Sequence, residues 1–201
     1  MPFSSQPLPD EGYFLDTEGT GLFRFVKCAV AALALAGAVE RRAVAQTAEV
    51  ALTFDDLPAM SMPNEAYVEQ LNRDLLAGLH RHRIPATGFV NEGKLGQFNQ
   101  RRELAVLRGW VRAGMDLGNH TYSHESLNVL GPRKFEADVA RGEHWTRRLL
   151  AQRHKRLRWF RFPDLETGAT PSVKLDVARW LARRGYRSAP VTIDPDEWEF
   201  A

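Results

Sequence analysis

The sequence contains little cysteine, little net charge and no long hydrophobic run. Its single cysteine, Cys28, excludes an intramolecular disulfide framework and a cysteine-rich zinc module. The 27 Lys and Arg residues nearly balance the 25 Asp and Glu residues, which argues against a nucleic-acid-binding protein that relies on bulk charge. The apolar stretch at 28–39 is shorter than the roughly 20 residues that span a bilayer, so no stable membrane span is expected. A chain of 201 residues with 44% hydrophobic content can form one globular domain, which we expect to be a monomer.

The first 45 residues have the features of an N-terminal extension and a signal peptide. Arg24 and Lys27 precede the short apolar stretch, and an Ala-x-Ala site follows it at 43–45. Positive residues, an apolar stretch and small residues at a cleavage site are typical of secretory signals. We therefore expect cleavage after Ala45 and a secreted, periplasmic or cell-envelope location. The alternative is that 28–39 forms a buried Ala-rich helix of the domain itself.

The remaining domain, 46–201, alternates between strand-like and helix-like patterns. Short apolar runs predict five strands, and apolar residues spaced by three or four predict four helices between them. Strands separated by helices form βαβ units, so the sequence predicts an α/β fold with a parallel sheet. The strands are expected at 50–54, 84–90, 115–119, 157–162 and 188–194, and the helices at 64–82, 101–113, 135–149 and 172–184.

Polar residues follow each predicted strand at its carboxyl end. In parallel α/β folds these ends meet on one rim, which is where reactive groups gather. The residues expected on this rim are Asp55, Asp56, Asn91, Glu92, His120, His124, Arg161, Asp194 and Trp198.

The adjacent carboxylates in "TFDDLP" predict a bound cation, because two like charges at the end of an apolar strand repel each other. The stretch "NHTYSH" supplies His120 and His124, whose i, i+4 spacing places them on one face of a helical turn. Two imidazoles and the Asp56 carboxylate would make a three-ligand site with an open position, as in catalytic zinc centres. Co²⁺, Ni²⁺ and Mn²⁺ also suit this ligand set. Asp55 would then remain free as a base beside a metal-polarised water.

Each of these residues also has a structural interpretation. An Asp pair at a strand end often caps a helix or lies in a solvated turn. Histidines spaced by four are often on a solvated helix face, and Arg161 could be a charge on an edge strand. The coincidence of the Asp pair and the His pair at the ends of predicted strands favours the metal site.

With these motifs the sequence resembles the polysaccharide deacetylase family, the NodB-homology domain of carbohydrate esterase family four. The stretch "TFDDLP" matches the family's Thr-Phe-Asp-Asp-Gly-Pro except at Leu57, and "HTYSH" matches its His-Ser/Thr-x-x-His. The stretch "RFPDL" provides Arg161 and Pro163 of Arg-x-Pro-x-Gly, with Leu165 in the glycine position. The stretch "DPDEW" resembles a fourth motif, with Glu in place of the usual Asp before Trp198.

The resemblance implies a distorted (β/α) barrel, here incomplete at its C-terminus, and a metal-dependent hydrolase that removes acetyl groups from N-acetylated sugars. By the matching motifs, the metal ligands would be Asp56, His120 and His124. Asp55 would be the general base, Arg161 would orient it, and Asp194 would support Arg161. Pro163 and Trp198 would belong to the substrate pocket, with Trp198 beside the acetyl methyl group. The expected partner is an N-acetylated carbohydrate.

The family's fifth motif, a Leu-x-His that supplies a general acid, has no match before the last residue, Ala201. Two alternatives therefore stay open beside an active deacetylase. One is an impaired remnant that keeps a metal or carbohydrate site. The other is a related hydrolase of different non-peptide C–N bonds, such as those of cyclic ureides or imides.

Overall fold

The computed structural model describes residues 50–59 and 62–195. The predicted signal peptide and the predicted pocket residue Trp198 lie outside these ranges, so both stay predictions. Among the described helices, none combines the length and the apolarity needed to cross a membrane.

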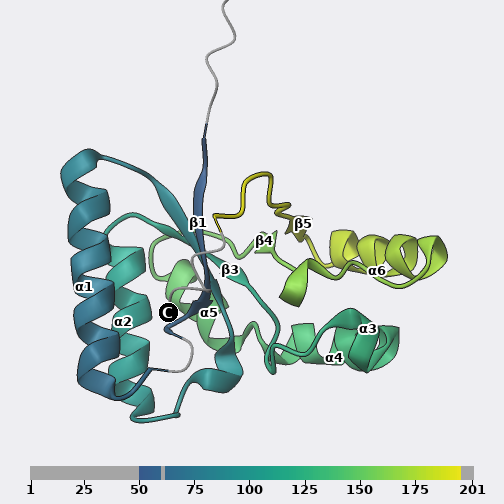
Figure 1. Cartoon of the computed structure of the whole chain (residues 1–201), viewed down its shortest axis with the longest axis horizontal. Coiled ribbons are helices and arrows are strands. Elements are labelled where there is room, and N and C mark those ends of the chain that lie inside the picture. Colours follow the sequence, from purple (N-terminus) through teal and green to yellow (C-terminus); the bar gives the residue numbers. More distant parts are fainter. Residues whose placement is uncertain (1–49, 60–61, 196–201) are drawn as a thin grey trace, which may run out of the picture. The chain divides into compact units, whose positions relative to one another are not determined.

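The described domain is built on a five-stranded parallel sheet (Figure 1). The strands are β1 (Leu52–Leu57), β2 (Ala86–Val90), β3 (Asp116–Asn119), β4 (Trp159–Phe160) and β5 (Arg187–Ser188). They lie in the sheet in the order in which they occur in the chain, and every neighbouring pair is parallel. This order is that of a (β/α) barrel, whereas a doubly wound sheet reverses its strand order at a switch point. The predicted α/β class with a parallel sheet is confirmed.

Helices connect the strands and cover the sheet. They are α1 (Glu65–His82), α2 (Gln100–Arg112), α3 (Leu127–Leu130), α4 (Pro132–Arg141), α5 (His144–Ala151) and α6 (Pro171–Arg183), with short 3₁₀ turns η1 (Glu92–Lys94) and η2 (Pro163–Leu165). Side chains of Asn64, Asn99 and Thr170 cap the first turns of α1, α2 and α6 by accepting a backbone N–H. Helices α1 and α2 lie side by side at one side of the sheet, and α3, α4 and α6 lie at the other (Figure 1).

The structure differs from the predicted elements in several places. Strand β4 is limited to Trp159–Phe160 of the expected 157–162, β1 continues to Leu57 beyond the expected end at 54, and the short helix α3 was not predicted. The single helix expected at 135–149 is broken into α4 and α5 at Gly142 and Glu143. A Cβ on Gly142 would lie only 2.5 Å from the Thr121 carbonyl carbon, so the chain turns here to pass beside the loop after β3. The last strand, expected at 188–194, is limited to Arg187 and Ser188.

The hydrophobic core lies between the sheet and its helices. Its fully buried members include Trp110 and Leu107 of α2, Phe89 of β2, Phe160 of β4 and Phe135 of α4. Burial of each such side chain contributes about 1.5–3 kcal/mol, and more for the larger rings. The core therefore fixes the strands whose carboxyl ends carry the polar residues considered next.

Candidate metal centre

A bulge at the end of β1 brings the two adjacent carboxylates to the same place. Neighbouring side chains on a regular strand point to opposite faces of the sheet. The β1–β2 pairing shifts register between Phe54 and Leu57, and Asp56 adopts a left-handed backbone conformation with φ 61°. A bulge re-aims the side chain that it carries. Asp55 and Asp56 consequently both approach the histidines that follow β3.

His120 is buried and its ring is oriented by the backbone. Its Nδ1 lies 2.9 Å from the carbonyl oxygen of Arg161, and this acceptor requires that Nδ1 carry the proton. Burial lowers the pKa of His120, although the Asp55 carboxylate opposes this effect. The ring is therefore held as a neutral imidazole with an unprotonated Nε2, the form that binds a metal ion.

His124 reaches the same place from a tight loop. Thr121 and His124 both adopt left-handed conformations, each with φ 67°. The helical turn predicted for these histidines is therefore wrong, and their proximity comes from loop geometry. The His124 amide donates to Thr121 Oγ1, and the Thr121 amide donates to Asn119 Oδ1.

Asp138 of α4 holds the middle of this loop. Its Oδ2 accepts hydrogen bonds from the amides of Tyr122 and Ser123, at 3.1 and 2.9 Å, and from Ser123 Oγ at 3.0 Å. The Tyr122 carbonyl accepts a hydrogen bond from Gly93 on the other side. The loop that carries His124 is thus fixed by elements that follow two different strands.

Asp56, His120 and His124 form a cluster that fits a divalent metal ion. One ligand atom from each residue lies within 4.8 Å of the others. His124 Nε2 is 3.4 Å from Asp56 Oδ1. Two ligands bound tetrahedrally at zinc distances are separated by about 3.3 Å. A carboxylate oxygen and two imidazole nitrogens are borderline ligands that suit Zn²⁺ and also other first-row divalent ions.

Arg161 is buried and paired with Asp55, so it is not a solvated charge on an edge strand. Its Nη1 donates to Asp55 Oδ1 and to Thr53 Oγ1, each at 2.8 Å, and its Nε donates to the Ala189 carbonyl oxygen. Asp55 Oδ2 remains on the side of His120, 3.8 Å from Nε2. Arg161 therefore fixes the orientation of Asp55 and leaves one oxygen directed toward the cluster.

The Arg161–Asp55 contact joins two distant strands of the sheet. Arg161 directly follows β4, and Asp55 belongs to β1, three strands away in the sheet. In a flat sheet strands three places apart would be separated by about 14 Å, which Arg and Asp side chains would bridge only when extended toward each other. A contact of 2.8 Å between them is favoured by a sheet that curves, as in a barrel-like fold.

Asp56 has a cationic partner that the sequence did not indicate. Lys94, the last residue of η1, places its Nζ 2.9 Å from Asp56 Oδ1. The two adjacent carboxylates are thus each balanced by a basic side chain, Asp55 by Arg161 and Asp56 by Lys94. No periodicity or motif signals Lys94, because its position depends on the turn that the chain makes after β2.

Two residues expected on the rim are structural. Glu92 is buried, and its carboxylate caps α5 by accepting hydrogen bonds from the amides of Trp145 and Thr146. Asn91 is buried as well, and its Nδ2 donates to the His120 carbonyl oxygen. Both residues support the cluster and are not exposed to a ligand.

The other predicted site residues lie on the loops after β4 and β5. Pro163 is buried at the start of η2, and Asp194 is exposed after β5. Their proposed contacts with substrate and with Arg161 stay predictions.

Strained backbone is concentrated around the site. Asp56, Thr121, His124, Asp164 and Leu165 all have positive φ without being glycine. Such conformations cost of order 1–3 kcal/mol each and are often retained at functional sites. Leu165 stands in the glycine position of the third motif, and its φ of 56° is a backbone conformation that favours glycine.

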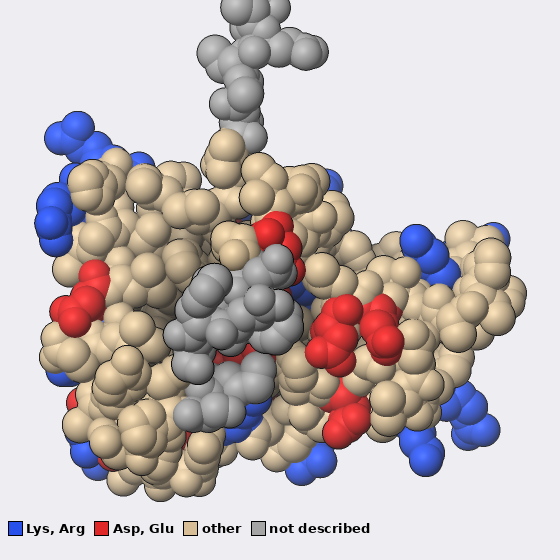
Figure 2. Space-filling model, in the orientation of Figure 1, with Lys and Arg blue, Asp and Glu red and all other residues tan. Residues whose placement is uncertain are grey.

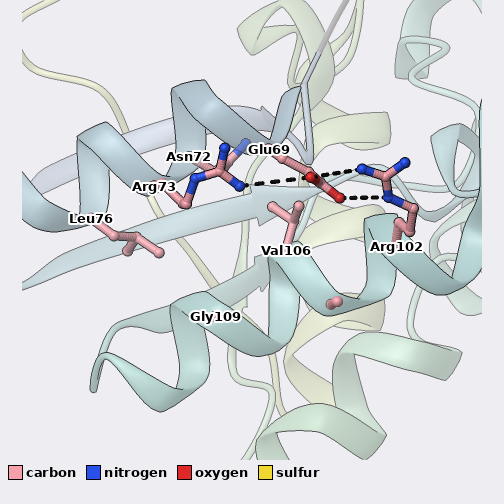
Figure 3. A pocket seen from close by; sticks show the side chains of 8 residues that line it. Glu69, Asn72, Arg73, Leu76, Arg102, Val106 and Gly109 are labelled. Atoms are coloured by element: carbon pink, nitrogen blue, oxygen red, sulfur yellow. Dashed lines mark hydrogen bonds and ion pairs between the residues drawn. The ribbon is translucent and has the colours of Figure 1, made fainter. Parts of the chain in front are cut away.

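A separate groove lies between α1 and α2, and none of its lining residues belongs to the cluster (Figure 3). Its charged side chains are paired with one another. Arg102 donates two hydrogen bonds to Glu69 and contacts Glu65, and Arg73 also contacts Glu69. With these charges neutralised, the groove offers no charged group for catalysis.

The surface seen in Figure 2 is not strongly basic. Asp and Glu side chains gather to the right of its centre, and most Lys and Arg side chains lie around the outline. This face of the described residues therefore has no broad positive patch for a polyanion such as nucleic acid.

Solved structures with a similar fold include a carbohydrate esterase and a polysaccharide deacetylase. A family 4 carbohydrate esterase from Streptomyces lividans, solved with acetate, aligns with a TM-score of 0.54 and 25% identity over 76% of this chain and 67% of that chain. A polysaccharide deacetylase from Bacillus cereus aligns with a TM-score of 0.56 at 19% identity, over 76% of this chain and 65% of that one. These similarities confirm the fold predicted from the sequence.

Curated relatives are deacetylases of acetylated sugars. A chitooligosaccharide deacetylase of Sinorhizobium fredii is 29% identical over 152 residues, which cover 74% of this chain and 59% of that protein. A peptidoglycan-N-acetylglucosamine deacetylase of Bacillus cereus is 30% identical over 152 residues, covering 76% and 47%. The chain thus spans about half the length of these relatives. The sequence profile described as polysaccharide deacetylase matches residues 43–182, and the chain belongs to that family.

Proposed function

We propose that the domain removes N-acetyl groups from an N-acetylated oligosaccharide or polysaccharide with the help of one divalent metal ion, most readily Zn²⁺. The observation that carries this proposal is the convergence of Asp56, His120 and His124 beside the Asp55–Arg161 pair. The names of the deacetylase relatives support the substrate class. A bound divalent ion would supply a Lewis acid and a water of lowered pKa.

The chain's own residues have distinct tasks in this proposal. His120 and His124 would offer imidazole nitrogens to the ion, and Asp56 would offer a carboxylate oxygen. Asp55 acts as the general base, because Arg161 binds its Oδ1 and leaves Oδ2 directed toward the ligand cluster. The Arg161 guanidinium, stacked 4.4 Å from the centre of the Phe89 ring, keeps that carboxylate from rotating.

Metal analysis and acetate release test this proposal together. The purified protein should hold close to one divalent ion, and His120→Ala should lose it, whereas His82→Ala at the exposed end of α1 should not. Asp55→Asn should keep the ion but lower acetate release from N-acetylglucosamine oligomers by roughly 10²–10⁴-fold. Asp176→Asn, an exposed carboxylate on α6, is the matched control for Asp55→Asn and should change neither quantity. Absence of metal from the unmutated protein would refute the metal-dependent mechanism.

The same measurements separate the two alternatives. A remnant would bind the ion with His120-dependent affinity yet release no acetate. A hydrolase of other C–N bonds would be inactive on the sugars but active on cyclic ureides or imides, with the same dependence on Asp55.

We also propose that the domain acts outside the cytoplasm. The supporting observation is the sequence pattern before Ala45. N-terminal sequencing of the exported protein should begin at Gln46, and retention of the full N-terminus in the cytoplasm would contradict export.

A further inference from the structure

Lys94 contacts the same Asp56 oxygen that lies near His124. Its Nζ is 2.9 Å from Asp56 Oδ1, and the same Oδ1 is 3.4 Å from His124 Nε2. The side chains of Lys94 and Asp56 are 19% and 17% exposed, so solvent screens this pair only in part. The Lys94 ammonium thus contacts Asp56 Oδ1, an atom that could also bind the metal ion.

The position of Lys94 is fixed by the backbone around it. The Lys94 amide donates to the Asn91 carbonyl, and the neighbouring Gly93 amide donates to the Tyr122 carbonyl at 2.9 Å. A Cβ on Gly93 would lie 2.3 Å from that carbonyl oxygen, so only glycine permits this approach. On the other side, Glu92 caps α5. The turn η1 is therefore held between the histidine loop and α5, and Lys94 is not a freely moving surface side chain.

The charges around the cluster balance because of Lys94. The carboxylates of Asp55 and Asp56 are matched by the cationic side chains of Arg161 and Lys94. Removing the ammonium would leave one net negative charge beside the ligands. A divalent ion binds more strongly to a negative site than to a neutral one.

We propose that Lys94 sets the metal affinity of this centre, as a positioning residue that takes the place of the ion on Asp56 in the metal-free protein. The inference rests on the metal-dependent function proposed above. In the metal-free state the ammonium neutralises Asp56 and holds it in the ligating orientation. An ion at the cluster would compete with the Lys94 ammonium for Asp56 Oδ1, and this competition would keep the metal affinity moderate.

The test compares the unmutated protein with Lys94→Met, which removes the charge and keeps the chain length. Lys94→Arg retains the charge, and Lys134→Met, on the exposed surface of α4, is the matched control. The measurements are the dissociation constant of Zn²⁺ or Co²⁺, by competition with a chromophoric chelator, and the unfolding temperature with and without the ion. Far-UV circular dichroism establishes that each variant is folded, and Lys94→Gln replaces Lys94→Met if the latter is not.

The expected result is tighter metal binding and a less stable metal-free protein. The dissociation constant of Lys94→Met should fall about tenfold or more, as expected when a charge 4–6 Å away is removed. Its metal-free unfolding temperature should decrease, and added Zn²⁺ should raise it more than in the unmutated protein. Lys94→Arg and Lys134→Met should stay within about threefold of the unmutated affinity, since both keep the cationic charge beside Asp56.

The possible failures are distinguishable. Equal or weaker metal binding by Lys94→Met, with normal binding by the unmutated protein, would overturn the role of Lys94 and leave the proposed function intact. If neither protein binds a divalent ion, both the role of Lys94 and the metal-dependent function are refuted.

Discussion

Gly88 and Leu57 form a pair that explains one departure of this chain from its family's first motif. Leu57 stands where that motif has glycine, and its side chain is buried, with 5% exposed. The space that it fills lies over Gly88 of β2. A Cβ on Gly88 would be 2.0 Å from Leu57 Cδ1 and 3.3 Å from Trp110 Cε3. The larger residue on β1 thus requires the smallest residue on β2.

Gly88→Ala should therefore destabilise the domain. Carbon atoms pack at about 3.5–4.0 Å, so Leu57 would have to move by more than about 1 Å against a core that includes Trp110. Overpacking of this kind costs about 1–3 kcal/mol. Gly78→Ala in α1 is the matched control, because its Cβ would meet nothing within 4 Å and alanine favours a helix by about 1 kcal/mol.

The assay is urea unfolding followed by tryptophan fluorescence, with Leu57→Ala and the double variant Leu57→Ala/Gly88→Ala included. Leu57→Ala alone should cost about 2–5 kcal/mol through the cavity that it leaves. The double variant should be more stable than the sum of the single effects by at least about 1 kcal/mol, because the new methyl group enters that cavity. Additivity within about 0.5 kcal/mol would refute the pairing of these two residues.

Three further predictions follow from contacts in the described domain. Asp138→Ala should weaken Zn²⁺ binding by roughly 10–100-fold in a chelator-competition assay, because the His124 loop loses three hydrogen bonds. Glu136→Ala, which removes the other carboxylate of α4, is the matched control and should bind normally. Leu165→Gly should raise the free energy of unfolding by about 0.5 kcal/mol in urea titrations. Glycine relieves the strain of the left-handed backbone in the folded state, and this gain exceeds the entropy that glycine adds to the unfolded chain. A loss of stability would contradict this reasoning. Burial raises the pKa of Glu143, but hydrogen bonds from Tyr186 and Arg147 more than offset this effect and leave the pKa below its usual 4.5. The stability that Glu143 contributes is therefore present above pH 4.5 and is lost as the pH falls through the lowered pKa. Urea titrations from about pH 6 to about pH 3 should therefore show a shallower loss of stability for Glu143→Gln than for the unmutated protein, and parallel curves would exclude this contribution.

The sequence predicted those features of the fold that depend on local patterns. Apolar runs and helical spacing placed five strands and most helices, because periodicity reflects which face of each element is buried. The carboxyl ends of parallel strands share one rim, so the amino-acid sequence alone was enough to expect Asp56, His120 and His124 together. The order of the strands then follows from short βα connections.

The features that the sequence did not predict depend on contacts between distant segments. Gly142 interrupts a good helical pattern because the Thr121 backbone passes too close for a side chain. Glu92 was expected on the rim, yet it caps a helix more than fifty residues later in the chain. The spacing of the two histidines suggested a helical turn, whereas left-handed residues create the same proximity. Lys94 could not be predicted, because one lysine in a charged sequence carries no pattern.

The Arg161–Asp55 pair has a consequence for how the domain folds. Its partners are 106 residues apart, whereas the neighbouring strands pair through much shorter connections. Closing so long a loop is entropically costly, so this contact is expected to form late, after the individual βα units have assembled. Orientation of the Asp55 carboxylate should therefore be completed late in refolding, after the ligand cluster of Asp56, His120 and His124 has formed. Stopped-flow refolding with a metal-sensitive dye should then show metal binding before acetate release recovers.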